Sequence, residues 1–219
     1  MTVNKRLGDA SETIATPRLR LIAYGAFARE LLAIIHQLPP DVAELACLPA
    51  AWHNYSKKIV PGIKSMIKAV LKAGLTPVVI YGDCGAGVKL DAFLDEENIA
   101  RIPSPHCYQS SMVEADFDAA MDQELGTFFL TNYMVGRFER IVMKDIGLRD
   151  HPHLRDIYFA HSKRVLYIVQ THDNTLVEKA RQAAATLQLD YDYHYTGYGD
   201  YTAILDNLCR RRQASVAAS

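Results

Sequence analysis

The stretch TPVVIYGDCGAGVKLDAFLDEENIARIPSPHCY, from Thr76 to Tyr108, decides the fold. It begins with a short β-rich apolar run, Pro77 to Tyr81, of the kind that fills a parallel sheet buried on both faces. A glycine-rich turn follows, and then a polar helix is expected from about Lys89 to Glu97, before a second short strand from Ile99 to Ile102. This strand–helix–strand order predicts two parallel strands joined by a right-handed crossover.

Residues with metal-binding and nucleophilic chemistry follow both of these strands. Cys84 lies in the glycine-rich turn after the first strand, and His106 and Cys107 follow the second strand. If the two strands are neighbours they lie about 4.8 Å apart, so these residues leave the same carboxyl edge of the sheet. Ligands of open α/β sheets bind outside that edge. Two thiols and an imidazole would therefore share one crevice.

The rest of the chain shows the same alternation of strands and helices. Strands are expected at 19–23, 164–169 and 189–195, and helices at 26–38, 62–72, 175–187 and 201–209. Residues 42–48 fit either a strand or a helix. An acidic helix is expected at 112–123, a long apolar helix at 125–143, and a short helix ending at Phe159. The pattern predicts an α/β protein with a mostly parallel sheet flanked by helices, as one sheet or as two Rossmann-like lobes.

Length and composition allow a full hydrophobic core, because 49% of the 219 residues are hydrophobic. The expected organisation is a disordered N-terminal arm at 1–17, a first α/β lobe at 18–111, a helical connector at 112–160, a second α/β lobe at 161–209 and a disordered tail at 210–219. Most of the aromatic residues of the connector are expected in the core. An exposed remainder would serve as a contact in a homodimer.

Charge and hydropathy exclude several classes of partner. With 24 basic and 25 acidic residues, the formal charge of −1 gives no electrostatic footprint for nucleic acid or an anionic membrane. No uncharged apolar stretch approaches the length of about 18 residues that a membrane-spanning helix needs. The first residues lack the apolar core of a signal peptide, so a cytoplasmic protein is expected. The four cysteines are then reduced thiols, which favours metal binding, catalysis or packing over a disulfide.

Thiolate and imidazole ligands indicate a transition-metal site, with zinc preferred and iron, nickel or cobalt, including the cobalt of a corrinoid, as alternatives. Cys84 and Cys107 would supply two ligands, and His53 and His106 compete for a third position. We favour His106. His53 then faces the substrate or supports the ligands, together with Asn54, Asp83, Tyr108 and Tyr24. The competing interpretation is separate packing cysteines, because no Cys-x-x-Cys spacing is present and adjacent residues usually point in different directions.

The glycine turn also fits an anion-binding site. Gly82, Gly85 and Gly87 allow a close backbone approach, and the following helix directs its first N–H groups at the same point. The spacing matches neither the dinucleotide-binding nor the Walker pattern, so a simple strand-to-helix turn remains the plainer interpretation. A third interpretation makes Cys84 a nucleophile with a histidine as its base.

Five motifs together resemble the uncharacterised bacterial and archaeal family known as DUF1638: Gly82–Gly85, His106–Tyr108, Gly126–Thr131, Gly147–Leu154 and Thr196–Gly199. The resemblance extends from about Leu21 to Leu205. Members are often encoded beside corrinoid-dependent methyltransferases and one-carbon enzymes. Many have a cysteine near the position of Tyr24 and a glutamate at the position of Gln109, two departures that bear on any site needing a third thiolate or that carboxylate.

These observations lead to two functional hypotheses. The first is a metal-binding protein of one-carbon or corrinoid-linked metabolism that takes a small-molecule ligand, with a corrinoid protein or a methyltransferase as partner. If it is an enzyme, a metal-dependent methyltransferase or hydrolase fits best. The second is a non-catalytic module that binds a small anion or a partner protein and whose cysteines only pack.

Overall fold

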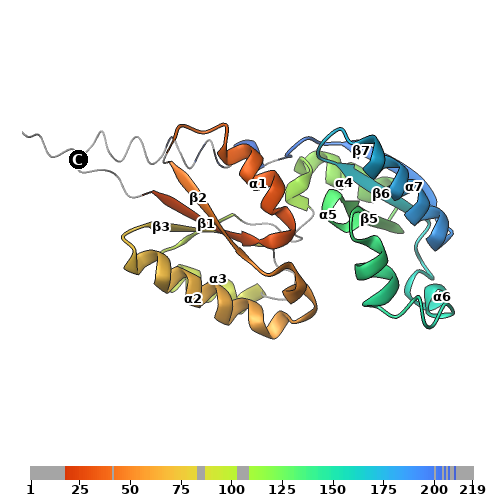
Figure 1. Ribbon diagram of the computed structural model, residues 1–219, viewed down its shortest axis with the longest axis horizontal. Helices are drawn as coiled ribbons and strands as arrows, with labels where there is room; N and C mark the ends of the chain where they lie inside the picture. The colour runs from red at the N-terminus through yellow and green to blue at the C-terminus, as the bar shows by residue number, and fades with distance from the viewer. Residues whose placement is uncertain are drawn as a thin grey trace, which may run out of the picture.

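A computed structural model describes residues 18–40, 42–82, 87–102 and 109–199, and further on 201–203, 205, 207 and 210. Figure 1 shows two sheets side by side, each accompanied by its own helices. All strand pairs in both sheets are parallel. The α/β class predicted from the sequence is confirmed.

The first sheet has four strands in the order β2-β1-β3-β4. Their bounds are Leu19–Tyr24 for β1, Ala43–Leu48 for β2, Thr76–Ile80 for β3 and Ala100–Ile102 for β4. Residues 42–48, which fit either a strand or a helix, form β2 because they pair with β1 along its whole length. The strands before and after α3 (Gly87–Glu96) are parallel, as predicted, and they are also neighbours, since Val78, Val79 and Ile80 pair with Ala100, Arg101 and Ile102.

Helices cover both faces of the first sheet. Helix α1 (Ala28–Ile35) lies on one face, whereas α2 (Ile59–Lys72) and α3 lie together on the other (Figure 1). Three short 3-10 helices connect elements here: η1 (Gly25–Phe27), η2 (Ala50–Asn54) and η3 (Ser56–Lys58). Because β1 leads to β2 on one side and β3 lies on the other, the chain changes direction between β1 and β3. Such a switch point is where doubly wound sheets bind their ligands.

The second sheet has three strands in the order β5-β6-β7, with bounds Thr127–Thr131, Arg164–Val169 and Asp190–Tyr195. Central β6 reads RVLYIV and every residue is buried, as expected for a parallel strand covered on both faces. Helix α7 (Asn174–Leu187) packs its alanines against one face, and α4 (Glu114–Gln123) covers the other. The remaining elements are η4 (Gln109–Ser111), α5 (Asn132–Val135), the π-helix η5 (Glu139–Lys144) and α6 (Leu154–Tyr158).

The prediction of one long helix at 125–143 is wrong. Residues 127–131 form β5, and only the part from Asn132 onward is helical. The apolar residues fit a helical period, but Thr-Phe-Phe-Leu-Thr also has high β-propensity. Pairing with β6 decides between the two, because it covers all of 127–131. The expected connector therefore contributes a strand to the second sheet, and the division into domains stays a prediction.

Helix ends are defined by local hydrogen bonds. The Asp173 carboxylate accepts from the backbone N–H groups of Thr175 and Leu176 at 2.9 and 3.3 Å, and so caps α7. After α2, Gly74 has a φ of +70°, and the N–H of Leu75 donates to the carbonyl of Val70. Helix α2 thus ends at Lys72, the last residue of the helix predicted at 62–72, and the turn after it uses a positive φ that favours glycine.

Strand β7 forms one edge of the second sheet, and its exposed side chains include Tyr193 and Tyr195. The backbone N–H of Tyr193 donates to Asp192 Oδ1 at 2.8 Å. A side chain of β7 therefore accepts a hydrogen bond from a backbone N–H group of the same strand.

Candidate functional site

The carboxyl ends of β1 and β3, on either side of the switch point, hold the described part of the predicted site. Tyr24 ends β1, and Tyr81 and Gly82 follow β3. Both tyrosines are buried, and their rings meet edge to face with centroids 5.9 Å apart. Gly25 allows β1 and β2 to approach closely, since a Cβ there would lie 2.6 Å from the carbonyl oxygen of Leu48.

Polar contacts tie the strand ends together in two pairs, β1 with the segment after β2, and β4 with β3. The Tyr24 hydroxyl donates to the carbonyl of Ala50, in the loop after β2, at 3.0 Å. On the other side, the Arg101 guanidinium of β4 donates to the carbonyl of Tyr81 from Nε and Nη2 at 3.1 and 3.0 Å, and Nη1 pairs with Asp91. Tyr24, predicted to face the substrate or support the ligands, therefore holds the edge together. Arg101 fixes the backbone directly before the glycine turn.

The loop that carries His53 is anchored by its neighbour Trp52. A Cβ on Gly62 of α2 would lie only 2.4 Å from Cζ3 of Trp52, so the indole packs closely over that glycine. Trp52 also packs against the first core. The backbones of His53 and Asn54 belong to η2, and their side chains lie outside the described part of the structure.

The predicted metal ligands Cys84, His106 and Cys107 lie outside the described residues, as do Asp83, Gly85 and Tyr108. Of the glycines predicted to bind an anion, Gly82 is buried at the end of β3, and Gly87 begins α3. Within the described ranges, no group of three or more His, Cys, Asp or Glu residues is placed to hold a metal ion.

Cys47 behaves as a packing residue. It is half-buried in β2, contacts the first core, and burial raises the pKa of its thiol, so it stays protonated at neutral pH. It differs in position from Cys84 and Cys107, which follow strands rather than lie in one.

The carboxyl edge of the second sheet holds a buried hydrogen-bond network. The Tyr167 hydroxyl donates to Asn132 Oδ1 at 2.7 Å, and Asn132 Nδ2 donates to Thr171 Oγ1 at 3.1 Å. Asn132 follows β5 directly, and Thr171 follows β6 by two residues. The neighbouring Gln170 is 2% exposed, and both polar atoms of its amide lack a hydrogen-bond partner among the described residues.

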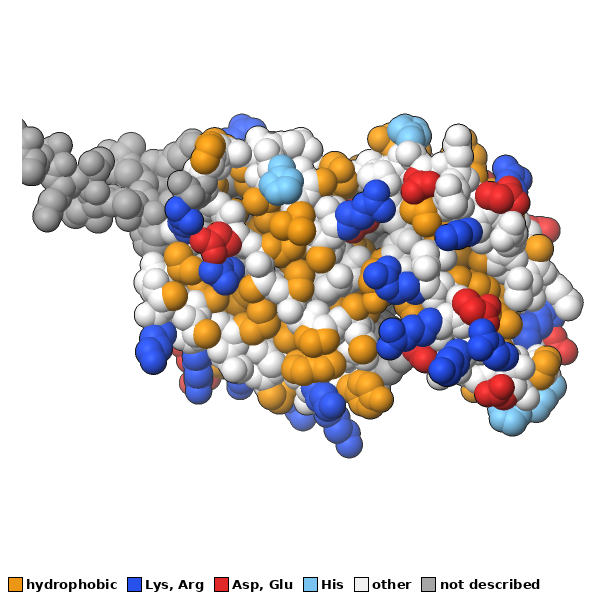
Figure 2. Space-filling view, in the orientation of Figure 1, with side chains coloured by type: hydrophobic (Ala, Val, Ile, Leu, Met, Phe, Trp, Pro, Cys, Tyr) orange, Lys and Arg blue, Asp and Glu red, His pale blue; other side chains and the backbone are white. Residues whose placement is uncertain are grey.

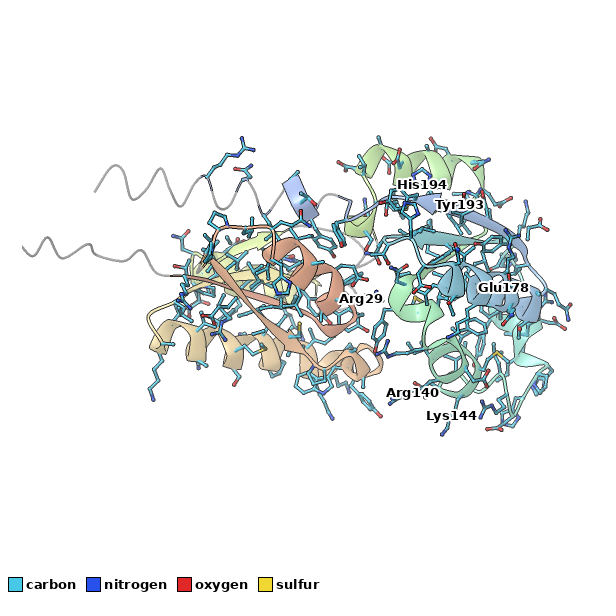
Figure 3. The ribbon with its side chains drawn as sticks, turned by 45° about the horizontal axis from the view of Figure 1, so that its top comes forward. Arg29, Arg140, Lys144, Glu178, Tyr193 and His194 are labelled. Atoms are coloured by element: carbon cyan, nitrogen blue, oxygen red, sulfur yellow. The ribbon has the colours of Figure 1, made fainter. Side chains whose placement is uncertain are left out.

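The two carboxyl edges meet. Tyr133, two residues after β5, and Tyr198, three residues after β7, both pack against the core of the first sheet. The ring of Tyr201 lies 5.8 Å from that of Phe27 of the first sheet's η1. Tyr193 and His194 of β7 lie at the end of the second sheet nearer the first (Figure 3).

Sequence reasoning missed Glu30, which lies at this junction. It is 2% exposed in the first turn of α1, and its Oε2 has no hydrogen-bond partner among the described residues. Burial raises the pKa of this carboxyl. The available signal was spacing, because Glu30 lies three residues after Phe27 and four before Ile34, both buried, and so falls on the buried face of the helix.

A cavity of about 350 Å³ lies apart from the predicted residues, between α4 and strands β6 and β7. Its ionisable side chains are already paired: His194 Nε2 lies 3.1 Å from Asp116 Oδ2, and Arg164 Nη1 lies 3.3 Å from Asp192 Oδ2. Arg164 donates further to Gln123 and to the carbonyl of Ala120. This internal pairing favours a structural role for these groups.

The fold defines an α/β protein built from two parallel sheets that meet at their carboxyl edges. None of the described helices is long and apolar enough to cross a membrane. The chain belongs to the family described as "Protein of unknown function (DUF1638)", whose model matches residues 47–205 and confirms the resemblance seen in the sequence. A comparison with curated proteins found no match. The matched range includes Cys84, His106 and Cys107.

Proposed function

We propose that this protein is a cytoplasmic metal-binding protein of one-carbon or corrinoid-linked metabolism, which binds a small molecule at the carboxyl edge of its first sheet. Cys84, Cys107 and His106 would hold the metal, with zinc the preferred ion. Two thiolates and one imidazole leave a fourth position open. A zinc ion there would polarise a bound ligand or lower the pKa of a bound water.

One observation carries this proposal: β3 and β4 are adjacent and parallel, beside the switch point between β1 and β3. The segment with Cys84 leaves β3, and the segment with His106 and Cys107 leaves β4, so both begin at the same edge. Arg101 ties these two strand ends together. The surrounding residues would orient the ligand, with Tyr24 and Tyr81 as an aromatic wall and His53 on the loop anchored by Trp52.

Elemental analysis of purified protein tests the proposal. We expect stoichiometric metal in the wild type, and its loss in Cys84→Ser, Cys107→Ser and His106→Ala. The double change Cys84→Ser/Cys107→Ser should be no worse than either alone, because ligands of one ion act as a unit. Cys47→Ser is the matched control and should keep full metal. His53→Ala should also keep the metal and lose ligand binding. Full occupancy in either cysteine variant, or metal-free wild type, would refute the assignment.

A metal-free protein would favour the alternative, a module that binds a small anion. Helix α3 begins at Gly87, directly after the glycine turn, so its first N–H groups are available to an anion held there. Phosphate binding to metal-free protein, measured by calorimetry, tests this alternative. A corrinoid protein or methyltransferase remains the proposed partner, and a homodimer remains the proposed assembly of any exposed aromatic face.

A further inference from the structure

Glu30 and Gln170 are buried polar residues whose hydrogen-bonding capacity is not used within the described chain. Each is 2% exposed, and the unpartnered atoms are Oε2 of Glu30 and both polar atoms of the Gln170 amide. Leaving such groups unpaired inside a protein is strongly unfavourable, and a carboxylate is the most costly case. Each such group requires a partner from outside the described chain, and a bound ligand is one source of it.

Both residues lie where the sheets meet. Burial raises the pKa of the Tyr167 hydroxyl, and the negative charge of Glu30 adds to that rise. Glu30 therefore lies close enough to β6 to act on this hydroxyl electrostatically. Tyr167 is bonded to Asn132, and Asn132 to Thr171, the residue after Gln170. Glu30 and Gln170 therefore approach one network from two different sheets.

The side chains of the network are hydrogen-bonded to one another. The Tyr167 hydroxyl donates to Asn132 Oδ1, and the Asn132 amide donates to Thr171. The free groups are a carboxylate oxygen, which accepts hydrogen bonds, and an amide, which both donates and accepts. Glu30 Oε2 is complementary to an ammonium group, and the Gln170 amide nitrogen to a carboxylate.

A positive charge completes the set. Arg29, the neighbour of Glu30, is exposed and lies on the side of α1 that faces α5 (Figure 3). Figure 2 shows further Lys and Arg side chains gathered over α5 and η5, where Arg137, Arg140 and Lys144 are exposed. The junction thus offers a buried acceptor with a basic surface beside it. This charge distribution attracts a molecule that carries a carboxylate as well as an ammonium group.

We propose that Glu30, Gln170 and Arg29 form a subsite for a small zwitterion of the amino-acid type, with the ammonium group at Glu30 and the carboxylate at Gln170 and Arg29. The inference deepens the proposed function by naming its class of small molecule, and rests on that proposal only for the place of the ligand at the carboxyl edges. It requires no metal at these three residues.

A ligand-free site of this kind lowers stability in a pH-dependent way. Because burial raises the pKa of Glu30 above its ordinary 4.5, the folded state holds this proton more tightly than the unfolded state. The stabilisation that the protonated Glu30 side chain gives the folded state is full below pH 4.5 and is lost as the pH rises through the raised pKa. Glu30→Gln, which stays neutral, should therefore gain stability over the wild type as the pH rises from about 4 to 7.

Calorimetric titration of the full chain with glycine and the common L-amino acids tests the inference. Methylammonium and acetate serve as probes that carry only one of the two charges. We expect at least one amino acid to bind, and both single-charge probes to bind more weakly. Glu30→Gln and Gln170→Leu should each weaken that binding by about ten- to one-hundred-fold, as expected when a buried charged hydrogen bond is lost. The matched control is Glu178→Gln, an exposed glutamate on α7 (Figure 3), which should leave affinity unchanged.

Absence of binding by the whole panel, or equal affinity in wild type and Glu30→Gln, would overturn the inference; a buried water at Glu30 predicts this result. If Glu30→Gln does not fold, Gln170→Leu decides by the same criterion. Metal content is measured on the same samples. Amino-acid binding by metal-free protein would support this subsite and refute the proposed metal site. Full metal content without amino-acid binding would support the metal site and refute the subsite.

Discussion

Replacement of Gly62 by alanine tests how Trp52 anchors the His53 loop. In an exposed helical position this change stabilises a protein by about 1 kcal/mol. At Gly62 the new Cβ would lie 2.4 Å from Cζ3 of Trp52 and 2.9 Å from Cδ2 of Leu48, distances at which atoms must move. Overpacking of this kind costs about 1–3 kcal/mol. The overpacking cost outweighs the propensity gain, so we expect a net loss of up to about 2 kcal/mol, or up to about 8 °C in Tm for a chain of this size.

Thermal and urea unfolding of matched variants separate the two contributions. Ala69→Gly, at an exposed position of the same helix, measures the propensity difference alone and should cost about 1 kcal/mol. In a Trp52→Ala background, Gly62→Ala should become stabilising, because its main obstacle is gone. A higher Tm for Gly62→Ala in the otherwise wild-type chain would show that the indole does not pack over α2 as described.

Two further predictions concern the second sheet. Arg164→Leu should lower the unfolding free energy by about 2–4 kcal/mol, because the nearly buried guanidinium bridges Thr127, Gln123, Asp192 and the carbonyl of Ala120. Arg164→Lys should recover little of this loss. Urea unfolding measures it, and a wild-type midpoint in the leucine variant would contradict the role of this bridge. Asp173→Ala should cost about 1 kcal/mol through loss of the α7 cap, whereas Asp173→Ser, which keeps an acceptor, should cost less; equal losses would mean that capping is not the cause.

Most of the fold follows from local sequence patterns. The fully buried run of β6, from Arg164 to Val169, was predicted with its observed bounds, because six consecutive residues suited to a buried strand are flanked by polar turns. The end of helix α2 at Lys72 was predicted for a similarly local reason. Strand β5 was not predicted, because its pairing partner lies more than thirty residues away and the local pattern favoured a helix equally. The periodicity of a single segment contains no information about pairing with a distant strand.

The candidate site was likewise predicted only in part. The edge that carries the cysteine turns was predicted from chain order alone, since consecutive strands joined by a helix are parallel. The subsite with Glu30 was not predicted, because a glutamate in the first turn of a helix is ordinarily favoured by the helix dipole and exposed. The spacing from Phe27 and Ile34, which places Glu30 on the buried face of α1, was the one local signal against that expectation. Gln170 likewise follows a strand, a position where polar residues are common, and its burial is not visible in the local sequence.

The bond between Asp192 and the backbone N–H of Tyr193 affects how these molecules behave at high concentration. An exposed edge strand with tyrosines could pair with an edge strand of another molecule and begin a growing aggregate. Here the Asp192 carboxylate occupies one donor that such pairing would need. Full pairing of a further strand with β7 would therefore require this hydrogen bond to be broken.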